Sequence, residues 1–243
     1  MTLRWSVQVT TAPRQVDYLS DTLHSLDCAG WAEAATIHND EDRRLGSWGN
    51  LQRALKAAAE VDPDVALFLQ DDCLLSDNTR EYLEAVLPGQ PWWGNGKLGC
   101  LSLYLNEATS RKLKPGFSIA PMELMGQWGG GAVAFLMPRE SLQAIAANPP
   151  WPQSYHLSEI WLQSFCATNK LIWVDHCPSL VRHLGRVSAL KVIPNESQPR
   201  PEPAWSEWRH ESDWCQNALS LIPKSAQPES KPVPKKTAKT ALF

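Results

Sequence analysis

The first part of the chain shows two periodic patterns of apolar and polar residues, one after the other. Residues 3–11 alternate between apolar and polar side chains, which is typical of a half-buried strand. Residues 16–26 carry apolar side chains at helical spacing, and Gly30 follows as a stop. Residues 34–38 predict a second short strand. Strand, helix and strand at this spacing predict a βαβ unit with a parallel pair of strands.

The next part of the chain leads to two adjacent acids. A second helix is predicted from Gly46, and it precedes the apolar run Val65–Leu69, which predicts a strand buried on both faces. The strand ends in Gln70, Asp71 and Asp72. Open α/β sheets bind their ligands at the carboxyl ends of the strands. Because successive strand residues point to opposite faces, we expect the two acids to meet different partners. The alternative is that they cap a helix or a turn.

Later segments continue the alternation of helices and strands. We expect a helix at 78–87, a strand at 98–105, a buried strand at 132–137 after three consecutive glycines, a helix at 138–147, a helix that opens near Ser158, a strand at 171–174 and a short helix near 206–219. Residues 106–121 are polar and long enough to form a mobile substrate loop. The chain therefore predicts an α/β domain.

Charge and cysteine content reduce the number of functions that fit the sequence. The net charge is −3, but residues 223–243 contain five Lys and one Glu, which leaves about −7 for residues 1–222. An acidic folded part argues against strong non-specific binding of nucleic acid, although the tail can touch a polyanion. The six cysteines show no CxxC or zinc-finger spacing, and the first residues lack the apolar run of a signal peptide. We expect a cytoplasmic protein without an integral membrane segment. Most of the twelve Trp are expected in the core, and one or two could stack on a sugar or a base.

The order of these segments resembles a known enzyme class. It begins with a first strand and a polar turn, followed by an acidic loop and a helix that contains Asn50. The strand that ends in Gln70-Asp71-Asp72 comes next, and then the glycine-rich turn. The order ends with a helix that begins at an acid and with the sequence Ser-Leu-Val-Arg-His-Leu-Gly around His183. This order, over about residues 3–190, is similar to that of GT-A nucleotide-sugar glycosyltransferases. The resemblance implies a GT-A (Rossmann-like), mostly parallel sheet flanked by helices. It implies a GT-A domain over 1–192, with a nucleotide-binding half at 1–105 and an acceptor half at 106–192. The composition of the remaining residues predicts a Pro-rich extension at 193–222 and a disordered tail at 223–243.

The resemblance also implies roles for individual residues. In this class a DxD-type motif binds a divalent metal through its last acid, which here is Asp72. Gln70 replaces the first acid, so a role for that position is not carried over. A late histidine, here His183, completes the metal site, and Glu159 is placed as catalytic base. The residues implied in binding the nucleotide sugar are Thr11, Pro13, Arg14, Asp40, Asn50, Asp71, Gly130, Arg186 and Ser188.

The implied activity is transfer of a sugar from a nucleoside-diphosphate sugar, with UDP as the first choice of nucleotide, to a hydroxyl acceptor. Mn²⁺ or Mg²⁺ is the expected cofactor, and an imidazole ligand favours Mn²⁺. Glu159 as base implies inversion, whereas retention needs no such base. Two acceptors stay open, a surface or lipid-linked glycan and a hydroxymethylated pyrimidine in DNA. Outside this activity, the alternatives are a non-catalytic Trp-rich glycan-binding module and a nucleotidyltransferase. This chain lacks the Gly-rich, Lys-containing loop that a nucleotidyltransferase needs after the first strand.

Overall fold

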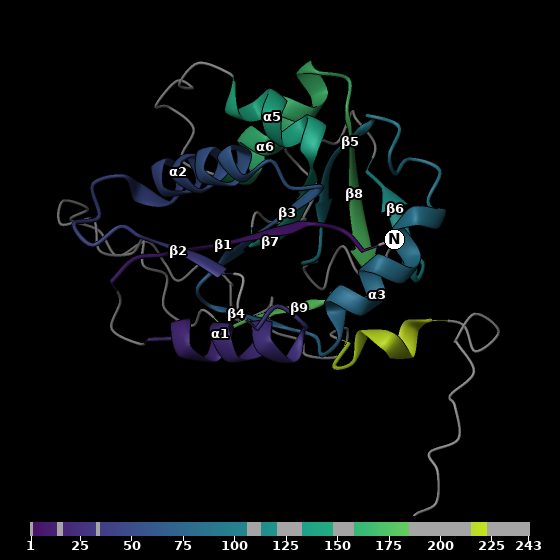
Figure 1. Ribbon diagram of the computed structural model, residues 1–243, viewed down its shortest axis with the longest axis horizontal. Helices are drawn as coiled ribbons and strands as arrows, with labels where there is room; N and C mark the ends of the chain where they lie inside the picture. Colours follow the sequence, from purple (N-terminus) through teal and green to yellow (C-terminus); the bar gives the residue numbers. More distant parts are fainter. Residues whose placement is uncertain are drawn as a thin grey trace, which may run out of the picture.

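A seven-stranded sheet between two layers of helices forms the body of the protein (Figure 1). The computed structural model describes residues 2–13, 17–32, 35–105, 113–120, 133–147, 158–184 and 215–222, and of 158–160 the backbone alone. In Figure 1, α2, α5 and α6 cover one face of the sheet, while α1 and α3 cover the other.

The first half of the chain forms the predicted strand–helix alternation. Its elements are β1 (Trp5–Thr11), α1 (Leu19–Cys28), β2 (Ala35–Asn39), α2 (Gly46–Val61) and β3 (Val65–Gln70). Strand β1 lies in the middle and pairs in parallel with both β2 and β3. The expected βαβ units are therefore present. All five residues of the apolar run Val65–Leu69 are buried, as expected for a strand covered on both faces.

The second half adds four strands to the same sheet. Its elements are β4 (Cys73–Leu75), α3 (Thr79–Val86), the 3₁₀ turn η1 (Leu87–Gly89), β5 (Leu98–Ser102), β6 (Gly116–Ile119), β7 (Ala134–Pro138), α5 (Arg139–Ala146), α6 (Ser158–Thr168), β8 (Ile172–Cys177), β9 (Val181–His183) and the 3₁₀ turn η6 (Ala218–Leu221). The strand order is β2-β1-β3-β7-β5-β8-β6.

The sheet is mixed but largely parallel. Strand β7 lies between β3 and β5 and is antiparallel to both. Strand β8 pairs in parallel with β5, and β6 is antiparallel to β8 at the sheet edge. Strands β1, β2, β3, β5 and β8 thus run in one direction, so their carboxyl ends lie at the same edge of the sheet. This agrees with the predicted α/β fold class.

Two local predictions need correction. The segment 106–121 was expected to be irregular, but residues 116–119 form β6, and Ser118 pairs with Asp175 of β8. This strand is only four residues long, and pairing with its neighbour stabilises it more than its own pattern does. The short strands β4 and β9 were not predicted at all. They pair with each other as a separate two-stranded antiparallel ribbon.

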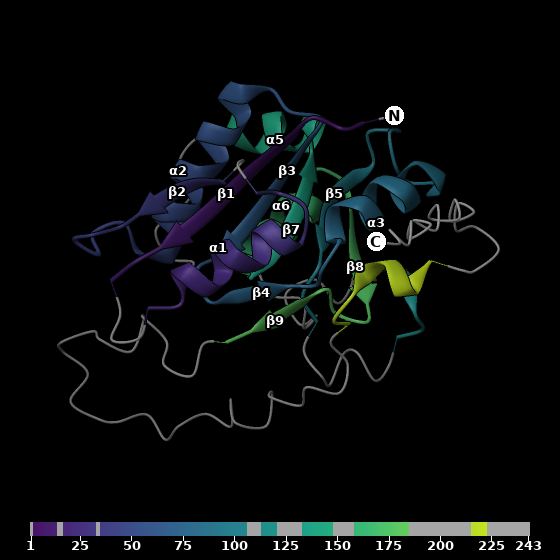
Figure 2. The ribbon, with the colours of Figure 1, turned by 60° about the horizontal axis from the view of Figure 1, so that its bottom comes forward.

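Each face of the sheet has its own apolar core. On one face, Val7, Leu67 and Val174 pack with residues of α1 and α3. On the other face, Phe68 and Trp173 pack with residues of α2, α5 and α6. Helix α1 packs against β4, and Figure 2 shows it alongside the β4–β9 ribbon. The ribbon therefore lies on the α1 side, next to the carboxyl edge of the sheet. Among the described residues, no helix combines the length and apolar character required to cross a bilayer.

Candidate functional site

The two acids after β3 lie at the edge where β1 and β3 end. The N–H of Asp71 donates to the carbonyl of Thr10 (3.1 Å), which continues the pairing of β1 and β3 by one residue. Both acids are nearly buried, with exposed fractions of 2% for Asp71 and 4% for Asp72. Burial of a carboxylate is costly unless the charge meets a donor or a cation. The partners of the two side chains therefore indicate what this edge can bind.

Asp71 faces the neighbouring strand β1. The hydroxyl of Thr11 donates to Asp71 Oδ2 at 2.5 Å. The resemblance placed Thr11 and Asp71 together in nucleotide-sugar binding, and the structure brings them into direct contact. Their hydrogen bond fixes the turn that follows β1 relative to the end of β3.

Asp72 faces the β4–β9 ribbon instead. Pairing of Cys73 with His183 in that ribbon places the imidazole next to the acid, and Asp72 Oδ2 lies 3.2 Å from His183 Nε2. The carbonyl of Asp72 also accepts the N–H of Leu184 at 2.7 Å. The side chain of Asp72 is 6% exposed and that of His183 is 31% exposed, so the imidazole reaches the surface. The two acids thus meet different partners, as their alternation along the chain predicted.

Tyr104 packs against the His183 side of the Asp72–His183 pair. Its ring lies edge-on to the His183 ring, with centroids 5.9 Å apart. Burial, with smaller electrostatic contributions from Cys73 and Asp72, raises the pKa of Tyr104 to about 12. The phenol therefore stays protonated at neutral pH, which leaves it a neutral hydrogen-bonding group beside the acid.

The Asp72–His183 pair fits a divalent cation. Two ligand atoms that lie about 2.1 Å from one octahedral ion, at right angles, are about 3 Å apart. The observed separation of 3.2 Å is close to this value. A carboxylate and an imidazole suit Mn²⁺, and the carboxylate suits Mg²⁺. Within the described ranges, no group of three or more His, Cys, Asp and Glu is arranged to hold a metal.

The loops after β1 and β2 are tied together beside the acids. Asn50 of α2 donates to the carbonyls of Thr11 (3.0 Å) and His38 (2.8 Å). The carboxylate of Asp40 accepts the N–H groups of Leu45 and Gly46, where α2 begins. In the structure, Asn50 and Asp40 thus bond to backbone and hold the two strand ends in place. Their implied contacts with a nucleotide stay a prediction.

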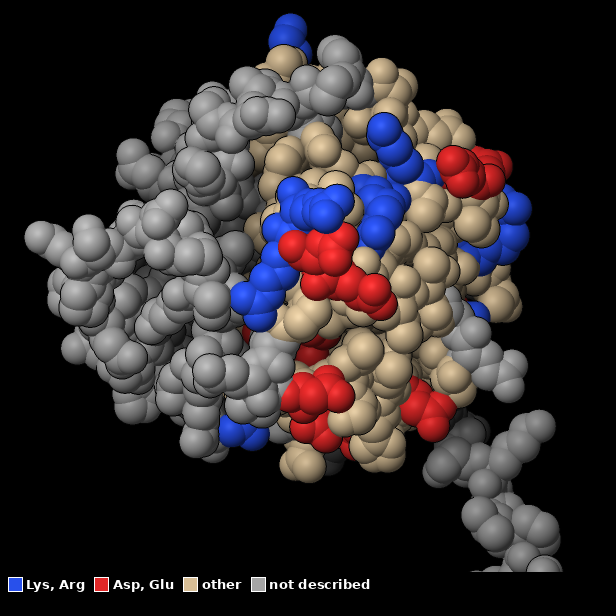
Figure 3. All heavy atoms as spheres, turned by 90° about the vertical axis from the view of Figure 1, so that its left-hand side faces the viewer, with Lys and Arg blue, Asp and Glu red and all other residues tan. Residues whose placement is uncertain are grey.

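The outer surface of these loops carries both charge signs. Residues 41–44 are exposed, and Arg44 lies 3.5 Å from Asp42. The Arg43 guanidinium donates to the carbonyl of Pro13, an exposed residue that the resemblance placed against the nucleotide. Figure 3 shows this side of the molecule, where basic and acidic side chains lie next to one another. The rim beside the site can therefore offer cationic groups to an anionic ligand.

Five of the predicted site residues cannot be placed in this arrangement. Arg14, Gly130, Arg186 and Ser188 lie outside the described residues, and only the backbone of Glu159 is described, near the start of α6. Their implied roles stay predictions.

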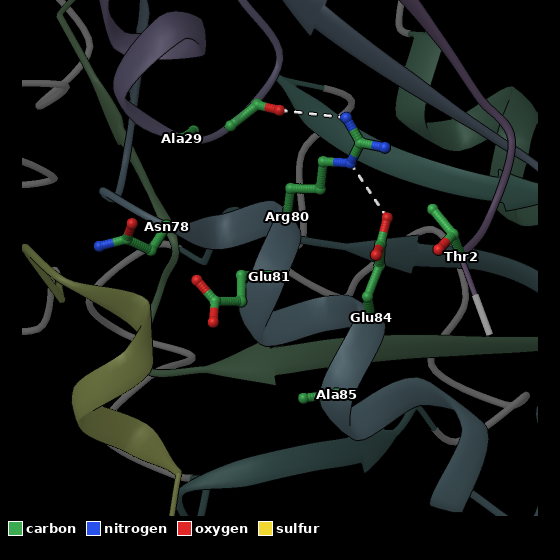
Figure 4. A pocket seen from close by; sticks show the side chains of 8 residues that line it. Thr2, Ala29, Asn78, Arg80, Glu81, Glu84 and Ala85 are labelled. Atoms are coloured by element: carbon green, nitrogen blue, oxygen red, sulfur yellow. Dashed lines mark hydrogen bonds and ion pairs between the residues drawn. The ribbon is translucent and has the colours of Figure 1, made fainter. Parts of the chain in front are cut away.

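A cavity of about 520 Å³ lies between the segment before β1, the end of α1 and the first turns of α3 (Figure 4). It is lined by Thr2, which precedes β1, by Gly30, which follows α1, and by residues of α3. Arg80 and Glu84 form an ion pair there at 3.0 Å, and Arg80 also donates to the carbonyl of Gly30. None of the residues that line the cavity is among the predicted site residues.

One residue that supports the site was missed in the sequence. Thr22 of α1 is fully buried, and its hydroxyl bonds to the chain on both sides of Asp72. A signal was present, because Thr22 lies three residues after Leu19 and four before Leu26 on the apolar stripe of the helix. A polar residue on a buried stripe needs a hydrogen-bonding partner.

No protein-family model and no curated protein matches this chain. Solved structures with a similar fold include A197 from STIV, at 16% identity and TM-score 0.49, covering 74% of this chain and 83% of that one. A glycosyltransferase involved in glycosylation of the major capsid of PBCV-1 has 12% identity and TM-score 0.44, covering 76% and 96%. A mutant Drosophila β-1,4-galactosyltransferase 7, in complex with manganese, UDP-Gal and xylobiose, has 13% identity and TM-score 0.45, covering 84% and 79%. The structural neighbours of this α/β chain thus include GT-A glycosyltransferases.

Proposed function

We propose that this protein is a metal-dependent glycosyltransferase that moves a sugar from a nucleoside-diphosphate sugar to a hydroxyl acceptor. The observation that carries the proposal is the Asp72–His183 pair, whose ligand atoms lie 3.2 Å apart at the carboxyl edge of the sheet. The order of the motifs along the chain supports the proposal, because the resemblance implied Asp72 and His183 as the metal ligands. UDP-sugars are the proposed donors, and a glycan hydroxyl is the proposed acceptor.

Asp72 and His183 are the residues that would hold Mn²⁺ or Mg²⁺. When bound, such an ion supplies positive charge that offsets the negative charge growing on the leaving diphosphate. Sites of this kind commonly use one or two protein ligands together with the phosphate oxygens of the substrate and water. Two ligands from the described part of the chain are consistent with that composition.

The remaining residues act on the donor and the acceptor. The Thr11–Asp71 hydrogen bond and the Asn50 contacts shape the loop after β1, against which the nucleoside is proposed to bind. Glu159 is proposed to accept the proton of the acceptor hydroxyl. Its backbone lies in the first turn of α6.

Thermal unfolding with UDP and Mn²⁺ tests the proposal. We expect UDP with Mn²⁺, at about 100 times its Kd, to raise Tm by about 5–10 °C, and UDP with EDTA to raise it far less. Asp72→Asn should lose the Mn²⁺-dependent part of the shift. Asp42→Asn is the matched control, because Asp42 is exposed and pairs only with Arg44 in the contacts described. Equal shifts with and without Mn²⁺, or an unchanged shift in Asp72→Asn, would contradict the proposal.

Turnover separates the enzyme from a binding module. With a donor that the shift assay selects, Glu159→Gln should keep the Tm shift but lose about 10²–10⁴-fold in kcat, the usual contribution of a general base. Full turnover in this variant would remove Glu159 from the mechanism. Binding of glycan without any dependence on nucleotide or metal would favour the non-catalytic alternative.

A further inference from the structure

A buried hydroxyl of α1 forms hydrogen bonds to the backbone on both sides of Asp72. Thr22 Oγ1 donates to the carbonyl of Asp71 at 2.8 Å and accepts the N–H of Cys73 at 3.2 Å. These two groups belong to the peptide units immediately before and after Asp72. The exposed fraction of Thr22 is 0%, so water does not compete for its hydroxyl.

Backbone hydrogen bonds also hold the turn at Asp72. Its preceding residue is bonded to β1 through the Thr10 carbonyl, and its own carbonyl accepts the N–H of Leu184 (2.7 Å). The chain leaves β3 at Gln70 and enters β4 at Cys73, so Asp71 and Asp72 form a turn outside both strands. Asp72 itself thus lies between the two strands and belongs to neither. Among the contacts described, the Thr22 hydroxyl bonds to the backbone on both sides of Asp72.

We infer that Thr22 is a positioning residue for the cation site, and this inference rests on the proposed function. By holding both peptide units, the hydroxyl keeps the Asp72 carboxylate within reach of His183 Nε2. Groups that orient a metal ligand typically change metal affinity by about 10–100-fold when they are removed. Thr22 touches neither donor nor acceptor in this account, and it acts only through Asp72.

A neighbouring hydroxyl on the same helix provides a matched control. Ser25 Oγ accepts the N–H of Leu75 at 3.1 Å and donates to the carbonyl of Thr22 at 2.8 Å. It is also buried, at 7% exposed, and it bonds to the same segment three residues beyond Asp72. Ser25→Ala thus removes a comparable hydrogen bond from α1 without loosening the peptide units that flank the acid.

The test measures Mn²⁺ binding directly on the full chain. Free Mn²⁺ is read from its solution EPR signal during titration of the protein, without nucleotide. We expect Thr22→Val, which keeps the shape but loses the hydroxyl, to raise the Kd for Mn²⁺ about 10–100-fold. Thr22→Ser, which keeps the hydroxyl, should stay within about three-fold of the unmodified protein, and so should Ser25→Ala.

Turnover gives a second readout. If Thr22 only positions the ligand, Thr22→Val should raise the KM for Mn²⁺ by a similar factor while kcat at saturating Mn²⁺ changes by less than about three-fold. Equal effects of Thr22→Val and Ser25→Ala on Mn²⁺ affinity would overturn the inference. So would failure of both Thr22→Val and Thr22→Ala to fold, because the hydroxyl would then be required for the fold itself.

Failure of this inference can be told apart from failure of the proposed function. If the unmodified chain and Asp72→Asn bind Mn²⁺ alike, the cation site itself is wrong. If Asp72→Asn abolishes Mn²⁺ binding while Thr22→Val leaves it unchanged, the cation site is supported and the positioning role of Thr22 is wrong.

Discussion

The ring of His176 is fully buried, yet both of its nitrogens have hydrogen-bonding partners. Nδ1 lies 2.7 Å from the carbonyl of Pro178, which can only accept, so Nδ1 carries the proton. Nε2 lies 2.7 Å from the hydroxyl of Tyr82 and accepts from it. Burial, partly offset by the bond to Pro178, lowers the pKa of His176 to about 4. The imidazole is therefore a neutral link between β8 and α3.

This link predicts a specific loss of stability in acid. The pKa of His176 is about 4 in the folded state and about 6.5 when the chain is unfolded, so the unfolded chain binds the proton first. The stabilisation is complete above pH 6.5 and is lost as pH falls towards 4. Between pH 7.5 and 5, we expect this group to lower the free energy of unfolding by about 2 kcal/mol.

Urea unfolding at the two pH values measures this loss. The comparison is with the double variant Tyr82→Phe/His176→Phe, which removes the titrating ring without leaving the Tyr82 hydroxyl unpaired. The variant should show a pH dependence that is shallower by about 2 kcal/mol. His38, whose pKa is also lowered by burial and by Arg53, is present in both proteins and cancels in the comparison. Parallel pH profiles would contradict this account of His176.

Among the secondary-structure elements, α2 joins the ends of two parallel strands. Asn50 donates one proton to the Thr11 carbonyl of β1 and the other to the His38 carbonyl of β2, and its oxygen accepts from Arg53 at 2.7 Å. The side chain is 3% exposed. All of its hydrogen-bonding groups are thus used within the protein, and their effect is to fix the loops beside the site.

Replacement of this amide should cost stability. Asn50→Ala removes a side-chain donor from the carbonyls of Thr11 and His38, at about 1–3 kcal/mol, and regains at most about 0.7 kcal/mol through the higher helix propensity of alanine. We expect a net fall of about 1–2 kcal/mol in the free energy of unfolding, measured in urea. Asn95→Ala is the control, because Asn95 makes two hydrogen bonds of similar length in an exposed local turn. A smaller loss at Asn50 than at Asn95 would contradict the role given to the amide.

The elements that the sequence predicted are those with a long or clear pattern. The apolar run Val65–Leu69 and the helical stripe of α2 each span enough residues for their periodicity to be distinctive. Strands β4 and β9 are three residues each, and they form because they pair with each other and because α1 packs against β4. Such strands are determined by tertiary contacts, which a local pattern does not contain. The antiparallel direction of β7 is likewise set by its neighbours.

Across the whole molecule, the candidate site is made by two segments that are far apart in the chain. The sequence identified Asp72 and His183 through the resemblance of their motifs, and the structure places their side chains in contact. The means of contact, pairing of β4 with β9, was not predictable from either segment alone. Thr22 was missed for the same reason, because its partners are peptide groups of a distant turn. The fold class was predictable because it depends only on the order of strands and helices.

The most direct test of the central claim is the anomalous diffraction of manganese in crystals of the full chain grown with Mn²⁺ and UDP. The account predicts a manganese peak within about 2.3 Å of both an Asp72 carboxylate oxygen and His183 Nε2. A structure with UDP bound in which manganese lies at other residues, or in which the Asp72–His183 contact persists without it, would contradict the account.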